Sequence, residues 1–221
     1  MEMWIEGTIE QVIEVANKGM VDAIATNPSI MRRWTSGGRS LEDVVTEVCQ
    51  AVSVPLYVQL HGPTYDDFLF EMDQLRQISD QIHPKLVATH DGIGATRRIA
   101  ADGLKPLVTT IATLNQAFLA ASANAAYIAP YIGRILDSEV DAYQLIADIA
   151  EMYARHNIST KIAAASIRSP IQTEGVLLAG APVVVMQYQV FMQLLESDMT
   201  QNWIERFEDD WNNIPNQLGQ R

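Results

Sequence analysis

The chain has 221 residues, of which 48% are hydrophobic and 19% are charged, and its formal net charge is −12. This length can bury one sizeable core, so we expect a single domain over residues 1–221. The acidic balance disfavours binding to nucleic acid or to an anionic membrane, because a phosphate surface requires a basic partner. No stretch reaches the roughly 20 apolar residues of a membrane helix, and the N-terminus lacks the features of an export signal. The single cysteine, Cys49, excludes an internal disulfide. We therefore expect a cytoplasmic protein.

Short β-rich runs alternate along the chain with longer segments of helical periodicity. In chain order, the strand candidates are residues 3–7, 21–27, 55–61, 85–90, 106–111, 127–132, 161–166 and 182–187. Eight strand–helix pairs predict a closed (β/α)₈ barrel, or TIM barrel, with parallel strands. The rival is an open doubly wound sheet, which normally has a Gly-rich phosphate turn after its first strand. The segment Ile5-Glu6-Gly7-Thr8 does not supply that turn.

Beyond the last strand, the pattern predicts an extra C-terminal helix over residues 200–214. Trp203, Phe207 and Trp211 are spaced by four residues and therefore share one helix face. Three aromatic side chains present too much apolar area to leave in water. The helix either packs on a neighbouring subunit or docks on its own barrel, and the spacing alone leaves both arrangements open.

In such a barrel the active site lies at the carboxyl ends of the strands. The polar residues predicted there are Glu6, Thr26, Asn27, Gln59, Thr109, Thr110, Tyr131, Arg134, Ser166 and Arg168. The chain has four lysines, of which Lys85 stands in an apolar run. An amine kept out of water can lose its proton, and a neutral amine attacks ketones to form a Schiff base. Spacing alone does not single out Lys85, because a lysine near the start of a strand is normally solvated.

Three motifs together resemble the small transaldolases, and most closely their fructose-6-phosphate aldolase branch, over essentially the whole chain. Ala25-Thr26-Asn27-Pro28-Ser29-Ile30 resembles the family's Thr-Thr-Asn-Pro-Ser-Ile. The segment Ala129-Pro130-Tyr131-Ile132-Gly133-Arg134 is similar to Ala-Pro-Tyr-Val-x-Arg, and Ala164-Ala165-Ser166-Ile167-Arg168-Ser169-Pro170 to Ala-Ala-Ser-Phe-Lys/Arg-x-Pro. The resemblance implies the same barrel fold and places Lys85 on the family's Schiff-base lysine.

The resemblance implies an aldolase or transaldolase that cleaves or transfers the dihydroxyacetone unit of fructose 6-phosphate through a Lys85 imine. Gln59, Thr109 and Tyr131 match the positions that hold a proton-transferring water, and Glu6 stands where the family has an aspartate. Asn27 and Ser29 would bind hydroxyls of the dihydroxyacetone unit. Arg134, Ser166 and Arg168 would bind the phosphate, since guanidinium groups suit that anion. On spacing alone, a surface ion pair is as good an interpretation of Arg134 and Arg168.

The departures from the family pattern cluster around the chemistry. Glu6 carries one more methylene than the aspartate, which favours slower turnover or a changed substrate. The family's Lys-Val-Pro becomes Lys85-Leu86-Val87, and Pro84 precedes the lysine. Because proline lacks a ladder donor, we expect the strand to begin at Pro84 or to carry an irregularity there, and we expect either outcome to affect the depth of Lys85 in the barrel. These changes leave an alternative open, namely a silent or altered-substrate homologue retained as an oligomeric protein.

No metal or other cofactor is expected. His61, His83, His90 and His156 show no i, i+4 pairing and no cysteine partner of the kind that a zinc site needs. An imine itself accepts the electrons in aldol chemistry, so the reaction requires no metal. The resemblance also implies a ring-shaped homo-oligomer, a pentamer or a decamer, in which the C-terminal helix reaches a neighbour. A sugar phosphate is the expected small-molecule partner.

Overall fold

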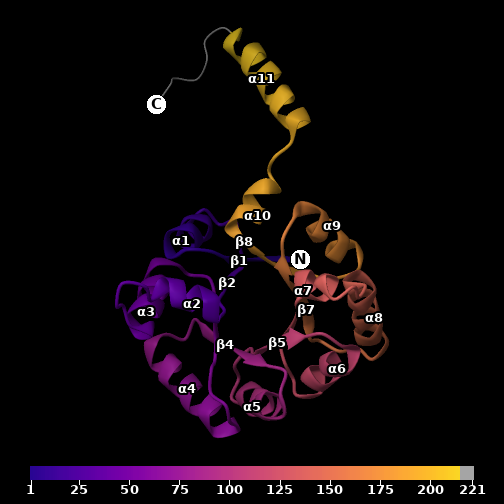
Figure 1. Ribbon diagram of the computed structural model, residues 1–221. Coiled ribbons are helices and arrows are strands. Elements are labelled where there is room, and N and C mark those ends of the chain that lie inside the picture. Colours follow the sequence, from indigo (N-terminus) through magenta and orange to yellow (C-terminus); the bar gives the residue numbers. More distant parts are fainter. Residues whose placement is uncertain (215–221) are drawn as a thin grey trace.

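A computed structural model describes residues 1–214, so residues 215–221 of the predicted domain lie outside the described part. Eight parallel strands form a closed barrel in the order β1 to β8, and β8 pairs with β1. The predicted (β/α)₈ barrel with an additional C-terminal helix is thereby confirmed, and helices surround the ring of strands (Figure 1). The strands are β1 Glu2–Glu6, β2 Ala23–Ala25, β3 Leu56–Gln59, β4 Ile82–Val87, β5 Leu107–Ile111, β6 Tyr127–Pro130, β7 Lys161–Ile167 and β8 Val183–Gln187. The helices are α1 Ile9–Asn17, α2 Pro28–Trp34, α3 Leu41–Ala51, α4 Tyr65–Ile78, α5 His90–Ala101, α6 Leu114–Ser122, α7 Ile132–Asp137, α8 Ala142–Arg155, α9 Pro170–Leu178, α10 Tyr188–Gln193 and α11 Asp198–Asn212.

Local side-chain chemistry sets where many helices begin. Thr8, Ser40 and Thr64 each accept a hydrogen bond from the backbone amide three residues later, and the side chain of that later residue accepts from the capping residue's own amide. This reciprocal capping box satisfies two amides that the first helical turn leaves unpaired. The sequence at these three positions therefore fixes where α1, α3 and α4 begin.

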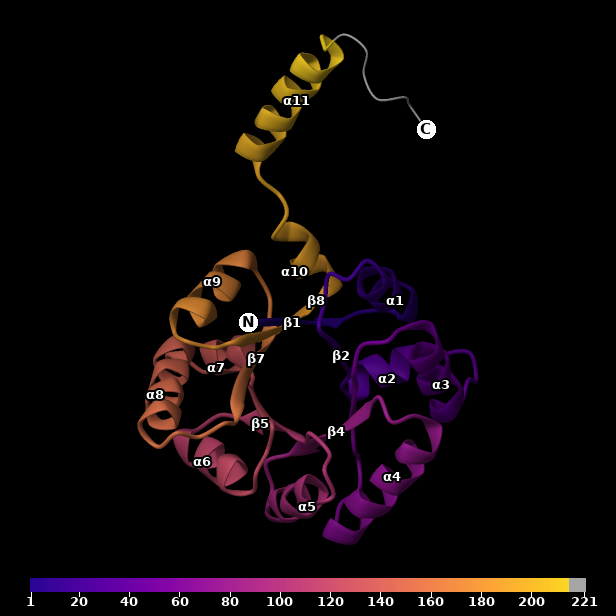
Figure 2. The same cartoon turned by 180° about the vertical axis from the view of Figure 1, so that it is seen from behind.

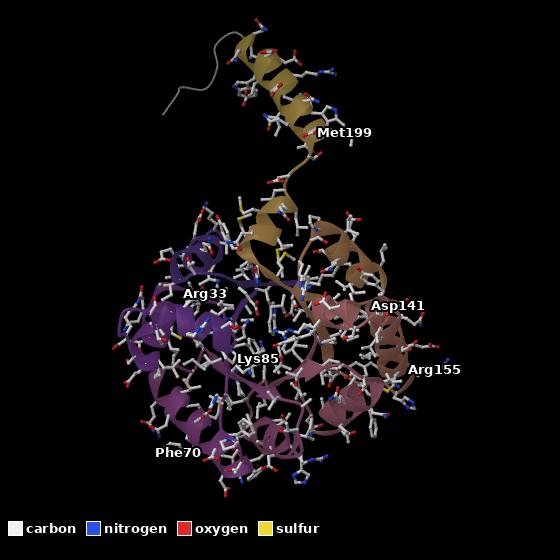
Figure 3. The ribbon with its side chains drawn as sticks, in the orientation of Figure 1. Arg33, Phe70, Lys85, Asp141, Arg155 and Met199 are labelled. Atoms are coloured by element: carbon white, nitrogen blue, oxygen red, sulfur yellow. The ribbon has the colours of Figure 1, made fainter. Side chains whose placement is uncertain are left out.

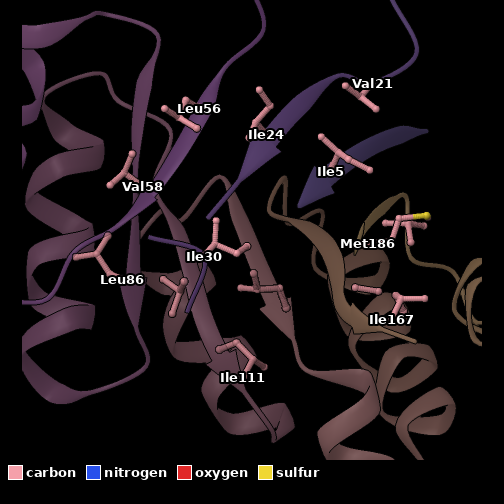
Figure 4. Packing of buried hydrophobic residues seen from close by; sticks show 14 of the residues in the cluster. Ile5, Val21, Ile24, Ile30, Leu56, Val58, Leu86, Ile111, Ile167 and Met186 are labelled. Atoms are coloured by element: carbon pink, nitrogen blue, oxygen red, sulfur yellow. The ribbon is translucent and has the colours of Figure 1, made fainter. Parts of the chain in front are cut away.

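Apolar side chains pack on both faces of the strands. One cluster lies between strands and helices and includes Ile5, Ile24, Leu56, Leu86 and Met186 (Figure 4). Alternate residues of the same strands point into the barrel, as the period of two in a strand requires.

The side chains that point into the barrel are large at one level of the barrel and small at another. Trp4 stacks on Tyr57 with ring centroids 4.3 Å apart, and Tyr127 meets the Trp4 ring edge-on at 4.7 Å. Nearer the carboxyl ends, the interior side chains include Ala25, Ala129 and Ala165. The aromatic layer fills the barrel, while the alanines leave space at the end where the site is expected.

Strand β4 differs from its prediction. It spans Ile82–Val87 rather than residues 85–90, and His90 begins α5, with Thr89 as the capping residue. The expectation of a start at Pro84 or of an irregularity was wrong, because the register with β3 runs unbroken from Leu56–Ile82 to Gln59–Lys85. Pairing with β5 begins only at Lys85, so the missing proline donor falls just outside that ladder.

Several other strands are shorter than predicted at their ends. Strand β2 ends at Ala25 because Asn27 caps α2, and Pro28 occupies the first helical position, where its missing amide costs nothing. Strand β6 ends at Pro130 because Ile132 begins α7. In both places a motif residue, Asn27 or Tyr131, lies beyond the strand end and precedes a helix instead of belonging to the strand.

Helix α11 points away from the barrel in both views (Figures 1 and 2). It has no buried residue, and Trp203, Phe207 and Trp211 are 53%, 68% and 56% exposed. In the described chain, α11 therefore does not pack on its own barrel.

Truncation of Trp4 tests the aromatic layer inside the barrel. Trp4→Ala should lower the free energy of unfolding by about 3–5 kcal/mol, because Trp4 is 1% exposed and its removal leaves a cavity. Phe70→Ala, at a side chain that is 65% exposed, should cost less than about 1 kcal/mol. Urea unfolding followed by circular dichroism measures both, and equal losses would contradict the packing described here.

Candidate active site

A cavity of about 450 Å³ opens at the carboxyl ends of the strands. The family resemblance gives a role to ten residues, and seven of them line this cavity, namely Glu6, Asn27, Ser29, Tyr131, Arg134, Ser166 and Arg168. The other three, Lys85, Gln59 and Thr109, are not part of its lining. A larger groove of about 680 Å³ lies outside the barrel between α3 and α4, and it is lined by residues such as Phe70 and Ile78. The cavity at the strand ends is the candidate site, because it brings most of the predicted side chains together.

Lys85 lies in the barrel interior, near the centre of the ring of strands (Figure 3). It is 2% exposed, whereas Lys18, Lys105 and Lys161 are exposed. Its Nζ donates a hydrogen bond to the Thr26 carbonyl oxygen at 2.8 Å and lies 5.9 Å from the centroid of the Tyr131 ring. The expectation that Pro84 changes the depth of the lysine is not met, since the side chain is fully inside the barrel.

Glu6 ends β1 beside this lysine and is 8% exposed. Burial raises the pKa of its carboxyl, and the charge of Lys85, a hydrogen bond from Asn27 and the charge of Arg33 oppose that rise. Asn27 Nδ2 donates to Glu6 Oε1 at 3.3 Å, while Asn27 Oδ1 accepts from the Ile30 amide at 3.0 Å. The capping residue of α2 thus also orients the acidic group of the site.

Gln59 and Thr109 stand on the strands that flank Lys85. Gln59 pairs directly with Lys85, and Thr109 pairs with Val87, two residues further along β4. Gln59 Oε1 and Thr109 Oγ1 are buried and have no hydrogen-bond partner among residues 1–214. A buried polar atom without a partner costs about 1–3 kcal/mol, so these two atoms favour binding of a water molecule or a substrate hydroxyl.

Bulges in two strands shape the wall of the cavity. The register shifts between Thr109 and Ile111 in β5 and between Ala164 and Ile167 in β7. Within these bulges, Thr110 has a φ of 61° and Ser166 has a φ of 59°, in the left-handed region that residues with a side chain seldom adopt. Both residues line the cavity, as is typical of bulges that redirect a side chain at a functional site.

Arg134 and Arg168 both line the cavity but contact different partners. Arg134 lies with its guanidinium carbon 5.8 Å from the Tyr131 ring centroid. Arg168 donates to both carboxylate oxygens of Asp137, at 2.9 and 2.8 Å, and this pairing lowers the pKa of Asp137. For Arg168 the surface ion pair is therefore present, and a phosphate would have to compete with Asp137.

Gly133 makes the position of Arg168 possible. A Cβ at residue 133 would lie 2.6 Å from Arg168 Nε and 2.7 Å from the Ser166 carbonyl oxygen. The glycine of the second motif therefore serves close packing between α7 and the β7 bulge.

Sequence reasoning missed Arg33 and Gln187, which also line the cavity. Gln187 ends β8, so the rule that selected the other strand ends could have found it. Arg33 follows Ser29 by four residues and therefore shares its helix face, but α2 had not been predicted as a helix.

The fold and the site together define a barrel enzyme of the class I aldolase and transaldolase type. Residues 6–218 match the family model described as transaldolase/fructose-6-phosphate aldolase. A "probable transaldolase" of Carboxydothermus hydrogenoformans is 34% identical over 212 residues, which cover 96% of this chain and 98% of the relative. One of Symbiobacterium thermophilum is 35% identical, with 96% and 97% covered, and one of Streptococcus pyogenes is 34% identical, with 96% and 98% covered. The chain belongs to the transaldolase/fructose-6-phosphate aldolase family, as its motifs predicted.

Two further observations concern the described part of the chain. Among residues 1–214, no helix has both the length and the apolar character needed to cross a membrane. Within the same range, no three histidine, cysteine or acidic side chains converge to hold a metal ion.

The raised pKa of Glu6 predicts a pH dependence of stability. The Glu6 carboxyl binds its proton more tightly in the folded chain than in the unfolded chain. Ionisation of Glu6 therefore lowers the free energy of unfolding as pH rises through the folded pKa. Below the ordinary pKa of 4.5 the carboxyl is protonated in both states, and this loss of stability disappears. Glu6→Gln should therefore be more stable than the parent protein at pH 8 and no more stable at pH 4.

Thermal unfolding of both proteins at the two pH values measures this difference. Glu174→Gln, at an exposed position of α9, is the control and should shift neither midpoint. A Glu6→Gln protein that is less stable at pH 8 would contradict the electrostatic account.

Proposed function

We propose that this protein is a Schiff-base aldolase or transaldolase of sugar phosphates, with Lys85 as the nucleophile. The observation that carries the proposal is the burial of Lys85, at 2% exposure, beneath a polar cavity at the carboxyl ends of the strands. An amine held out of water in such a place is suited to attack a ketone. Membership of the family supports the same chemistry.

The proposed reaction begins with fructose 6-phosphate. The neutral Lys85 amine adds to the C2 carbonyl, and loss of water gives a protonated imine. The C3–C4 bond then breaks, its electron pair moves into the imine, and glyceraldehyde 3-phosphate leaves as the C4 hydroxyl loses its proton. The remaining dihydroxyacetone enamine either takes a proton at C3 and is hydrolysed, which makes an aldolase, or attacks a second aldose phosphate, which makes a transaldolase.

Proton transfer is assigned to a water held by Gln59, Thr109 and Tyr131. The unpartnered Gln59 Oε1 and Thr109 Oγ1 are the acceptors that such a water would satisfy. Glu6 is placed to share this task, because a carboxyl with a raised pKa both accepts and returns a proton more readily near neutral pH. Its extra methylene relative to the family's aspartate favours a change in rate or specificity.

The ends of the substrate are assigned to opposite parts of the cavity. Asn27 and Ser29 would bind the hydroxyls of the dihydroxyacetone unit, since amide and hydroxyl groups both donate and accept. Arg134, Ser166 and Arg168 would bind the phosphate at the other end, with Asp137 displaced from Arg168. The observed Arg168–Asp137 pair also supports the alternative, a homologue with altered substrate or no activity, because in it the clamp is already satisfied.

Borohydride trapping distinguishes the proposal from the silent alternative. Incubation with fructose 6-phosphate or dihydroxyacetone followed by borohydride reduction should add one reduced three-carbon unit to Lys85, detected by peptide mass spectrometry. Lys85→Met should abolish the adduct, whereas Lys105→Met, at an exposed lysine, should leave it intact. Absence of an adduct at saturating substrate would favour the silent homologue.

The same family resemblance supports a homo-oligomer, a pentamer or a decamer, in which α11 packs on a neighbouring subunit. The exposed aromatic face of α11 supports this proposal, because apolar area of that size is normally covered. The cytoplasmic location stays a prediction, as does the role in pentose phosphate metabolism that the family resemblance implies.

Two serine substitutions in α11 test the assembly. Trp203→Ser with Phe207→Ser should reduce the mass measured by light scattering, because the face that contacts the neighbour loses its aromatic area. Glu205→Ser with Asp209→Ser changes the opposite face of the same helix and should leave the mass unchanged. An unchanged mass in the aromatic variant would count against packing through α11.

A further inference from the structure

Arg33 brings a positive charge to the cavity from the side opposite the predicted phosphate clamp. Arg33 is on α2, which follows β2, whereas Arg134 is on α7, which follows β6. In a closed barrel of eight strands in sequential order, β2 and β6 face each other across the ring. Helices α2 and α7 accordingly lie on opposite sides of the opening (Figure 1), and Figure 3 shows Arg33 on the α2 side with Lys85 inside the ring.

The end of α2 is fixed beside β1. Trp34 Nε1 donates to the Gly7 carbonyl oxygen at 3.0 Å, and this buried bond holds the helix against the residue that follows Glu6. Arg33 is therefore close enough for its charge to act on the Glu6 carboxyl. Its position at the cavity is determined by the fold and not by a mobile loop.

The charge of Arg33 is available to a ligand. Within residues 1–214, no carboxylate lies within ion-pair distance of Arg33, whereas Arg168 is held by Asp137. Glu6 is the acidic residue in the lining of the cavity, and burial raises the pKa of its carboxyl, although the charge of Arg33 opposes that rise. A free guanidinium at a polar cavity is a binding site for an anion.

The geometry also indicates which end of a substrate Arg33 would meet. Lys85 Nζ contacts the Thr26 carbonyl oxygen, immediately before the Asn27 cap of α2, so the attacked carbonyl carbon lies at the α2 side of the cavity. Ser29 and Arg33 are four residues apart on one helix face, about 6 Å along the axis. The hydroxymethyl group bonded to the carbonyl carbon would reach Ser29. A phosphate ester on that hydroxymethyl group would extend further along α2, towards Arg33.

We propose that Arg33 is a second anion-binding residue, which selects ketose donors that carry a phosphate on the short, carbonyl end. The inference rests on the proposed function and deepens it. Dihydroxyacetone phosphate is then the more tightly bound donor, and ketoses phosphorylated at both ends are accepted in addition to fructose 6-phosphate. Lys85 attacks either donor in the same way, with loss of one water from the addition product.

Trapping with two donors tests the proposal. The parent protein should form the reduced Lys85 adduct at a lower concentration of dihydroxyacetone phosphate than of dihydroxyacetone. Arg33→Ala should raise the half-maximal concentration of the phosphorylated donor about 10-fold to 100-fold, the range for hydrogen bonds to charged groups, and leave that of dihydroxyacetone unchanged. Arg32→Ala removes the neighbouring arginine, which does not line the cavity, and should change neither value. Arg33→Lys should fall between the two.

Three results would overturn the proposal. Equal trapping of both donors by the parent protein would show that no anion is recognised at this end. An equal shift of both donors in Arg33→Ala would mean that Arg33 acts only through Glu6. Loss of the phosphate preference in Arg134→Ala instead of Arg33→Ala would place the donor phosphate in the opposite clamp. Absence of any adduct with either donor would instead refute the proposed function itself.

Discussion

Burial of one amine inside the barrel is the constraint on which the site depends. Lys85 can be 2% exposed because β4 continues through Pro84 in register with β3, and because Thr26, at the end of β2, presents its carbonyl oxygen to the ammonium or amine group. The aromatic layer of Trp4 and Tyr57 closes the barrel interior, and small residues such as Ala129 leave space towards the carboxyl ends. Packing in this barrel therefore creates both the desolvated amine and the space beside the strand ends.

The distribution of charge explains how an acidic chain can bind an anionic metabolite. The net charge of −12 describes the whole molecule, while the cavity gathers Arg33, Arg134 and Arg168 at its rim. Local positive charge is effective because the cavity walls limit screening by water. The pair between Arg168 and Asp137 then sets one cost of phosphate binding, since a ligand must replace a bidentate partner. Arg33 has no such partner among the described residues, which is why the two sides of the cavity differ.

The sequence was a reliable guide where a local pattern determines the structure. Alternating strand and helix periods predicted the barrel, and the motif around Asn27 identified Asn27 and Ser29, which both line the cavity. Patterns failed where the outcome depends on tertiary contacts. The prediction of a strand start at Pro84 failed, because the effect of its missing donor depends on where β5 begins to pair. The left-handed backbone of Thr110 and Ser166 has no signal in residue type, because neither is glycine. Arg33 was missed because the short helix α2, which brings it to the cavity, had not been predicted.

The central claim is that the barrel holds Lys85 as the nucleophile of a Schiff-base site. A crystal structure of the protein after borohydride reduction with dihydroxyacetone tests it most directly, because it locates the covalent bond and its surroundings together. The account predicts continuous density from Lys85 Nζ to the central carbon of the donor, with the donor hydroxyls within hydrogen-bond distance of Asn27 and Ser29. Density that ends at an unmodified Lys85, or an adduct on Lys105 or another exposed lysine, would contradict it.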